Sequence, residues 1–200
     1  MADVVDSKST AERHGGSTPS IPTKYMKDIL ITKALNEEFP FEGYNSITTG
    51  VGKVNATLNL YSYLIKNVNI KLVINVGTAG GVNCIKNEVI ECGIFEDGQL
   101  EYPGFEGEII EFNIVKNKIL TFDNFIFDKP KKYCNCVDME SFALAKVCKS
   151  LNVEFRCFKY ISDIVGEENQ DSEWLENVSN GRYLLKNKVE DLLESRLTSK

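Results

Sequence analysis

The stretch Leu72-Val73-Ile74-Asn75-Val76-Gly77-Thr78-Ala79-Gly80-Gly81 decides the fold class. Its first half is a continuous apolar run of strand length, which is typical of a strand buried on both faces of a parallel sheet. The glycine-rich second half predicts a turn at which a ligand can approach the backbone closely. We therefore expect a ligand site at the carboxyl end of this strand.

Strand and helix patterns alternate on both sides of this strand. Apolar periodicity predicts helices over residues 54–67, 141–151 and 173–196. We expect further strands over residues 28–33, 46–49, 88–95, 108–115, 118–121 and 155–161. This order predicts a mixed, largely parallel α/β sandwich.

The chain is long enough for one domain, with 200 residues of which 42% are hydrophobic. Residues 1–24 are rich in Ser, Thr, Gly, Pro and charge and lack apolar periodicity, so we interpret them as a tail that is disordered or derived from an expression vector. Residues 25–200 are then the single folded domain.

Charge excludes some partners. The net charge is −6 and the pI is about 5.0, which argues against a nucleic-acid-binding surface. No apolar run approaches the roughly 18 residues that a membrane helix needs. The chain has four arginines, and none lies between Lys24 and Phe155. Arginine is the usual clamp for phosphate, so a phosphate site in this region is disfavoured.

The six cysteines form no CxxC pair, and the single histidine, His14, lies in the predicted tail. We therefore expect no metal site and no cofactor. No signal-peptide pattern precedes the cysteines, which indicates reduced thiols in a cytoplasmic protein.

Two glycine motifs fail on inspection. Gly50-Val51-Gly52-Lys53 resembles the end of a P-loop, but Val54 replaces the required Ser or Thr. The stretch from Gly77 to Gly81 does not have the G-x-G-x-x-G spacing of a dinucleotide site. Both are better interpreted as backbone approaches to a ligand that is not a dinucleotide.

Two acidic motifs follow predicted strands, Val137-Asp138-Met139-Glu140-Ser141 and Tyr160-Ile161-Ser162-Asp163. Each carboxylate has apolar neighbours in the sequence, so burial can tune its pKa for binding a polyol or moving a proton. Together with the glycine stretch, they predict one enzymatic cleft at the carboxyl edge of the sheet.

With these motifs, the chain resembles the nucleoside phosphorylase/hydrolase superfamily, and most closely the 5′-methylthioadenosine/S-adenosylhomocysteine nucleosidase family. Six motifs match in collinear order, and they are Ala34–Glu38, Thr49–Val54, Asn75–Gly81, Thr121–Ile126, Val137–Ser141 and Ile161–Asp163. The resemblance implies a three-layer α/β/α sandwich with a mixed, largely parallel central sheet.

The resemblance implies that Asp163 is the general acid at N7 of a purine, oriented by Ser162, because a neutral purine leaves more easily than an anion. Glu140 would accept hydrogen bonds from both ribose hydroxyls. Purely structural alternatives exist for both carboxylates: Asp163 as a cap after a strand, and Glu140 as an acidic residue in the first turn of a helix.

Other roles also follow from the resemblance alone. Glu38 would activate the attacking water, although the pair Glu37-Glu38 could equally be solvated. Lys159 stands where the family carries an arginine, and it lacks that planar fork. Substrate-binding positions implied by the resemblance are Met139 against the sugar, Phe125 and Ile126 against the purine, and Thr78, Ala79 and Gly80 at the glycine stretch. Core packing is the alternative for Met139, Phe125 and Ile126.

The implied activity is that of a purine nucleosidase acting on adenosine-type nucleosides, in methionine salvage. Phosphorylases of the superfamily hold phosphate with arginines contributed largely by the amino-terminal half. Beyond the predicted tail, that half has no arginine here, so water is favoured as the nucleophile. A purine- or uridine-type nucleoside phosphorylase and a non-catalytic nucleoside-binding protein stay open as alternatives. The resemblance also implies a homodimer, and the aromatic segment 95–105, with Tyr102 and Phe105, is the candidate loop over the partner's site.

Overall fold

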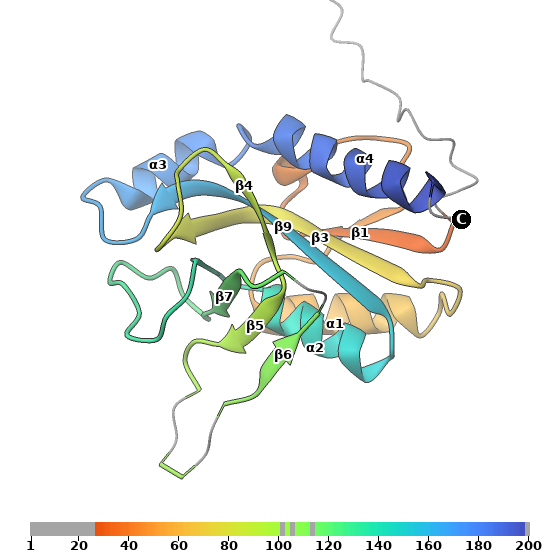
Figure 1. The fold of residues 1–200 in the computed structure, drawn as a ribbon, viewed down its shortest axis with the longest axis horizontal. Helices are drawn as coiled ribbons and strands as arrows, with labels where there is room; N and C mark the ends of the chain where they lie inside the picture. Colours follow the sequence, from red (N-terminus) through yellow and green to blue (C-terminus); the bar gives the residue numbers. More distant parts are fainter. Residues whose placement is uncertain (1–26, 101–102, 105–106, 113–114, 199–200) are drawn as a thin grey trace, which may run out of the picture.

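The structure, a computed structural model, describes residues 27–100, 103–104, 107–112 and 115–198 (Figure 1). The predicted tail 1–24 lies outside the described residues, as do Tyr102 and Phe105 of the candidate loop.

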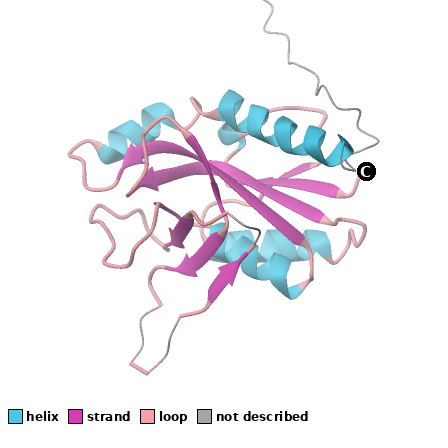
Figure 2. Ribbon diagram, in the orientation of Figure 1, coloured by secondary structure: helices cyan, strands magenta, loops and turns pink. Residues whose placement is uncertain are grey.

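The described residues form three layers. The strands are β1 (Ile29–Lys33), β2 (Ser46–Thr48), β3 (Leu72–Gly81), β4 (Val89–Cys92), β5 (Ile94–Asp97), β6 (Ile109–Glu111), β7 (Lys118–Thr121), β8 (Cys136–Asp138) and β9 (Glu154–Ile164). The helices are α1 (Lys53–Leu64), α2 (Ser141–Ser150), α3 (Gln170–Asn177) and α4 (Arg182–Thr198), with a short 3-10 turn at Asn36–Glu38. Helices α1 and α2 cover one face of the sheet and α4 covers the other (Figures 1 and 2). The predicted α/β/α sandwich is confirmed.

The long strand β3 organises the sheet. It pairs in parallel with β1 on one side and along its whole length with β9 on the other. Its last two residues also pair with β8, which runs antiparallel to it. Five of the eight strand pairings among the described residues are parallel, so the expected mixed, largely parallel sheet is correct.

Apolar side chains fill both interfaces between layers. The core under α1 and α2 includes Leu60, Leu144 and Phe155, each with no exposed surface. The core under α4 includes Ile74 and Val189, which are also fully buried. Burial of apolar side chains on both faces of β3 explains why its sequence reads as a continuous apolar run.

The prediction of a turn at Gly77–Gly81 is wrong, because these residues continue strand β3. The pairing with β9 runs on to Gly81 across a bulge between Ala79 and Gly80. The glycines serve close approach instead. A Cβ added at Gly81 would lie 2.7 Å from Ile164 Cδ1 and 2.8 Å from Ile161 Cγ2. Strand β9 likewise extends three residues beyond its predicted end, so Ser162 and Asp163 lie within it.

Two of the expected elements are each divided in two at a glycine. The expected helix 173–196 is two helices, α3 and α4, and a Cβ at the intervening Gly181 would lie 2.2 Å from the Tyr160 ring. The expected strand 88–95 is split into β4 and β5 at Gly93, where a Cβ would lie 2.3 Å from the Val115 carbonyl oxygen. Packing against another segment, rather than local propensity, requires glycine at these breaks.

No helix within the described part of the chain combines the length and apolar character needed to cross a membrane.

Candidate active site

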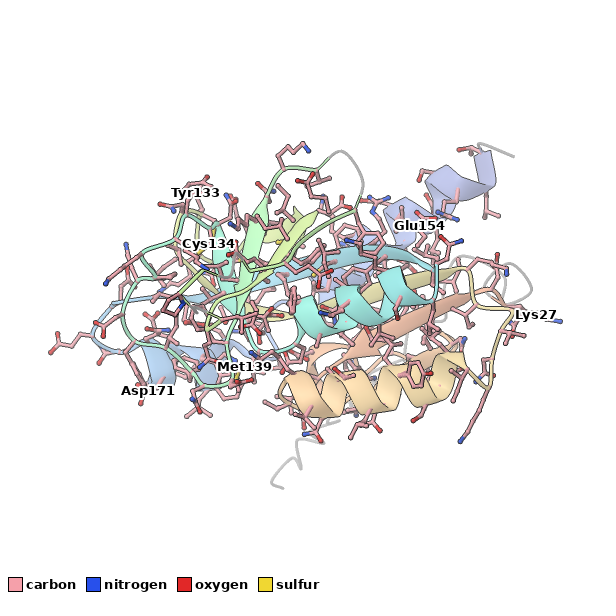
Figure 3. All side chains as sticks on the ribbon, turned by 90° about the horizontal axis from the view of Figure 1, so that it is seen from below. Lys27, Tyr133, Cys134, Met139, Glu154 and Asp171 are labelled. Carbon is pink, nitrogen blue, oxygen red and sulfur yellow. The ribbon has the colours of Figure 1, made fainter. Side chains whose placement is uncertain are left out.

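One cavity of about 360 Å³ lies where β3, β8 and β9 meet the loops after β1, β2 and β7. Its lining residues are Ala34, Leu35, Glu38, Val51, Thr78, Ala79, Gly80, Phe122, Asp123, Asn124, Phe125, Ile126, Val137, Asp138, Met139, Glu140, Asp163, Gln170 and Trp174. Figure 3 shows Lys27, before β1, at one end of the molecule and Asp171, in α3, at the other. Thr78, Ala79 and Gly80 of the lining lie near the end of β3, so the cavity is at the carboxyl end of this strand, as the sequence predicted.

Strand β8 reaches the cavity from the opposite direction. It is antiparallel to β3, with Val137 opposite Gly80 and Cys136 opposite Gly81. The chain then turns through Met139 into α2, so Asp138 and Glu140 are delivered beside the last residues of β3. Because β8 runs antiparallel to β3, the motif Val137–Ser141 lies beside the same end of β3 as the motif Tyr160–Asp163.

Two glycines of β3 make room for carboxylates. A Cβ at Gly77 would lie 2.9 Å from Glu38 Oε1, and one at Gly80 would lie 3.1 Å from Asp163 Oδ2. Neither glycine has a positive φ, so close approach and not backbone conformation accounts for them. The absence of side chains at Gly77 and Gly80 thus leaves space for the carboxylates of Glu38 and Asp163 against strand β3.

Glu38 is buried and held by four donors. Its Oε1 accepts hydrogen bonds from the Thr78 backbone N–H at 2.8 Å and from Thr78 Oγ1 at 3.1 Å. Its Oε2 accepts from the backbone N–H groups of Ala34 at 3.1 Å and Leu35 at 3.0 Å. Lys33 Nζ donates to the Phe39 carbonyl at 2.5 Å and ties the end of the 3-10 turn to β1. The solvated alternative for Glu38 is therefore wrong.

Asp163 is fully buried on β9 and borders the cavity. Ser162 Oγ donates to Asp163 Oδ1 at 2.6 Å. Asp163 Oδ2 has no hydrogen-bond partner among the described residues. Burial raises the pKa of Asp163, and the Ser162 hydrogen bond only partly opposes this. The group therefore favours the protonated form more than an exposed aspartate does.

Glu140 is 6% exposed and immediately precedes α2. Its Oε1 accepts a hydrogen bond from the Gly52 backbone N–H at 2.8 Å, which fixes the carboxylate across the cavity rather than at its own helix terminus. Burial, and then the neighbouring charge of Asp138, raise the pKa of Glu140 to about 7. Glu140 thus changes charge close to neutral pH in the ligand-free protein.

Lys159 lies behind the cavity wall in a buried ion pair. Its Nζ is 3.0 Å from Asp138 Oδ2, and both side chains are 2% exposed. Burial alone would lower the pKa of Lys159, but the charge of Asp138, with those of Glu140 and Glu38, outweighs it and raises the pKa. Asp138 is also bonded to Thr121 Oγ1 at 2.8 Å. The positive charge of Lys159 therefore lies beneath the acidic cavity and does not line it.

The purine-side segment predicted from the sequence is also in the cavity. Phe125 lies against Trp174, with 6.3 Å between the ring centroids. The Ile126 carbonyl accepts a hydrogen bond from Gln170 Nε2 at 3.1 Å. Met139 is half-buried and lines the cavity, so it is not a plain core residue.

Nine of the eleven predicted site residues line the cavity, and they are Glu38, Thr78, Ala79, Gly80, Phe125, Ile126, Met139, Glu140 and Asp163. Ser162 and Lys159 lie just behind it, bonded to Asp163 and Asp138. The structure thus brings the eleven residues together, while the roles given to them stay predictions.

Sequence reasoning missed two residues of α3, Gln170 and Trp174, and it gave Asp138 no role of its own. Gln170 and Trp174 are four residues apart on one helix, a spacing that places both on the same face. This spacing could have indicated that both residues lie on the face toward the cavity, but the predicted helix began at Glu173 and so excluded Gln170.

No arginine is among the residues that line the cavity. Within the described residues, Arg156 pairs with Glu91, and Arg196 pairs with Glu154 at 2.8 Å. Lys53, near the mouth, is 2.8 Å from Asp97 Oδ2 and 3.2 Å from Asp123 Oδ1. Lys53 and Lys159 are therefore each paired with aspartates.

Comparison with known proteins agrees with this geometry. The family model described as "Phosphorylase superfamily" matches residues 113–194. The 5′-methylthioadenosine/S-adenosylhomocysteine nucleosidase of Bacillus cytotoxicus is 30% identical over 163 residues, which cover 63% of this chain and 70% of that protein.

Solved structures share the fold. The nucleosidase of the same name from Colwellia psychrerythraea, in complex with adenine, has a TM-score of 0.74 at 18% identity and covers 83% of this chain and 94% of its own. Futalosine hydrolase of Helicobacter pylori has a TM-score of 0.73 at 16% identity and covers 86% and 99%. These structures agree with the chain in fold, and the relative from Bacillus cytotoxicus shows that the chain belongs to the 5′-methylthioadenosine/S-adenosylhomocysteine nucleosidase family of the phosphorylase superfamily.

Proposed function

We propose that this enzyme hydrolyses the N-glycosidic bond of a 5′-modified adenosine, such as 5′-methylthioadenosine or S-adenosylhomocysteine, and releases adenine and a ribose derivative. The observation that carries the proposal is the convergence of Glu38, Glu140 and Asp163 on one cavity of about 360 Å³. Each carboxylate has a distinct environment, which suits three different tasks in one reaction.

Asp163 is suited to act as the general acid toward N7 of the purine. The residue borders the cavity, its Oδ2 has no hydrogen-bond partner among the described residues, and Ser162 Oγ donates to its Oδ1. Because burial raises the pKa of Asp163, the carboxyl group keeps a proton more readily than an exposed aspartate. A well-placed acid contributes typically about 10²–10⁴-fold to the rate.

Glu140 is suited to bind the ribose hydroxyls. A charged carboxylate can accept from both members of a vicinal diol, and it also favours positive charge developing on the ribosyl ring. Gly52 N–H fixes its Oε1, and Met139 beside it supplies an apolar contact for the sugar. The hydroxyl groups of a bound diol would donate hydrogen bonds to Glu140 in place of those that an exposed carboxylate receives from water.

Glu38 is suited to activate the attacking water. It follows β1, whereas Asp163 lies on β9, and the donors from Thr78, Ala34 and Leu35 hold its carboxylate in one orientation. A fixed carboxylate can orient water toward C1′ while the base leaves on the other side.

Water is favoured over phosphate as the nucleophile because the cavity offers no cationic clamp. None of its lining residues is an arginine or a lysine. Lys53 and Lys159 are each paired with aspartates. A phosphate would therefore add negative charge to a cavity that is already acidic.

The test is an assay for adenine with 5′-methylthioadenosine as substrate, run with and without inorganic phosphate. Adenine release at equal rates in both supports the nucleosidase. Release that requires phosphate identifies a phosphorylase, and binding without release identifies a non-catalytic member.

The proposal extends to a homodimer. Val54, Leu58 and Tyr61 are 72%, 60% and 47% exposed on one side of α1, which is more apolar surface than a solvated helix usually presents. The prediction of a loop over residues 95–105 is wrong for residues 95–97, which belong to β5, where Phe95 is fully buried. Residues 98–105 stay the candidate loop over the partner's site. Sedimentation as a monomer at full activity would contradict the dimer.

We also propose that the protein acts in the cytoplasm, in methionine salvage. All six cysteines are free thiols and five of them are buried, which suits a reducing compartment. Fractionation of cells that express the tagged chain tests the compartment.

A further inference from the structure

We propose that Trp174 is a positioning residue which, through the hydroxyl of Thr78, holds Glu38 in its working orientation. This role depends on the proposed function, in which Glu38 activates water. Trp174 is the only tryptophan of the chain. It lies on α3, 96 residues from Thr78 in the sequence.

Helix α3 is held by hydrogen bonds of two residues that precede Trp174. Gln170, one turn earlier, donates from Nε2 to the Ile126 carbonyl and accepts at Oε1 from the Gly166 backbone N–H, each at 3.1 Å. Glu173 Oε1 accepts from Lys86 Nζ at 2.8 Å. With the helix held at these points, the indole ring of Trp174 has a defined direction into the cavity.

The indole meets Thr78 through its N–H group. Trp174 Nε1 donates to Thr78 Oγ1 at 3.2 Å. An indole N–H can only donate, so it occupies one acceptor position of the hydroxyl. The hydroxyl hydrogen is then directed away from the indole, toward Glu38 Oε1 at 3.1 Å.

A directed chain of hydrogen bonds therefore runs from Trp174 through Thr78 to Glu38. Successive hydrogen bonds of one direction polarise and strengthen one another. Without the indole, the Thr78 hydroxyl is free to rotate, and Glu38 Oε1 keeps only the backbone N–H of Thr78 at 2.8 Å. Trp174 thus acts on the water side of the site, while Gln170 on the same helix face acts on the purine side.

Trp174→Phe is the direct test, since phenylalanine keeps an aromatic ring and loses the N–H group. The substitution removes the bond from the indole to the Thr78 hydroxyl and, in this proposal, weakens the bond from that hydroxyl to the charged Glu38. We therefore expect kcat on 5′-methylthioadenosine to fall about tenfold, with KM changed by less than about twofold. Removal of cavity packing alone would instead raise KM.

A double-mutant cycle with Thr78→Val asks whether Trp174 acts through the hydroxyl. In the Thr78→Val background, Trp174→Phe should reduce kcat by less than about twofold, because the intermediate group is already absent. Thr198→Val, at the exposed end of α4, is the matched control and should leave kcat unchanged. Additive losses in the cycle would overturn the positioning role and leave the proposed function intact.

Glu38→Gln separates the two proposals. If it does not lower kcat, both the water-activating role and the positioning role fail. If it does, the cycle alone decides on Trp174.

An NMR measurement does not depend on activity or on a folded Trp174 variant. The wild-type protein has a single indole N–H resonance, which should move upfield in Thr78→Val and stay in place in Thr198→Val. An unmoved resonance in Thr78→Val would mean that the hydrogen bond does not exist in solution.

Discussion

Gly77→Ala tests whether Glu38 needs the space that a missing side chain at position 77 leaves beside β3. The added Cβ would lie 2.9 Å from Glu38 Oε1 and 3.3 Å from Lys159 Nζ. Lysine can yield, but Glu38 is held by four donors from Thr78, Ala34 and Leu35. To reach an ordinary contact, the carboxylate must move by about half an ångström.

The expected loss follows from that displacement. A misplacement of about 1 Å costs on the order of 100-fold in rate, so half of it should reduce kcat about tenfold. Stability should change little. The φ of Gly77 is not positive, so alanine can adopt this backbone conformation. Alanine also lowers the conformational entropy of the unfolded chain, which stabilises the folded protein by about 0.4–1 kcal/mol and offsets part of the strain.

The assay is initial-rate adenine release together with the thermal midpoint of unfolding. Gly107→Ala is the matched control, because the nearest atoms to its added Cβ lie at 3.7 Å. The reasoning is refuted if Gly77→Ala keeps wild-type kcat, or if its loss of turnover follows a loss of folded protein.

Three further outcomes are expected. Asp163→Asn should fold normally but lose about 10²–10⁴-fold in turnover, because an amide cannot deliver the proton; more than about a tenth of wild-type turnover would remove Asp163 from the acid role. Glu140→Gln should weaken catalysis on ribosides by roughly 1.5–3 kcal/mol and less on 2′-deoxy substrates, which lack one partner hydroxyl, so equal losses on both would contradict diol binding. Because the pKa of Glu140 is raised from 4.5 to about 7, folding stability from this group is present below pH 4.5 and is lost as the pH rises through 7. Denaturant titrations of the ligand-free protein between these pH values should therefore show a smaller decline in Glu140→Gln than in the wild type, and identical declines would sink the assignment.

Elements with strong local patterns were predictable. The apolar run of β3 and the periodicity of α2 place these elements within about a residue of their observed limits at most ends. Both patterns arise because the faces of a strand or helix that are buried must carry apolar residues, and this requirement fixes the spacing of apolar residues within the local sequence. The acidic motifs likewise marked where polar groups stand beside apolar strands.

Long-range contacts decided what the sequence left open. Gly77–Gly81 looked like a turn, and only pairing with β9 and the nearness of Glu38 and Asp163 explain why it is strand. The break at Gly181 depends on the Tyr160 ring, which is 21 residues away in the sequence. No local pattern could indicate these contacts, because each partner is supplied by another element.

The sequence by itself determined the layered α/β architecture, the acidic and arginine-free character of the site, and the identity of its three candidate carboxylates. Tertiary structure alone decided their states: burial raises the pKa of Asp163 and Glu140, and four donors hold Glu38. It also added Trp174, whose hydrogen bond to Thr78 joins residues that are 96 positions apart in the sequence. The physical reason is that residue types and periods are local properties, whereas desolvation and hydrogen-bond geometry exist only after distant segments have packed.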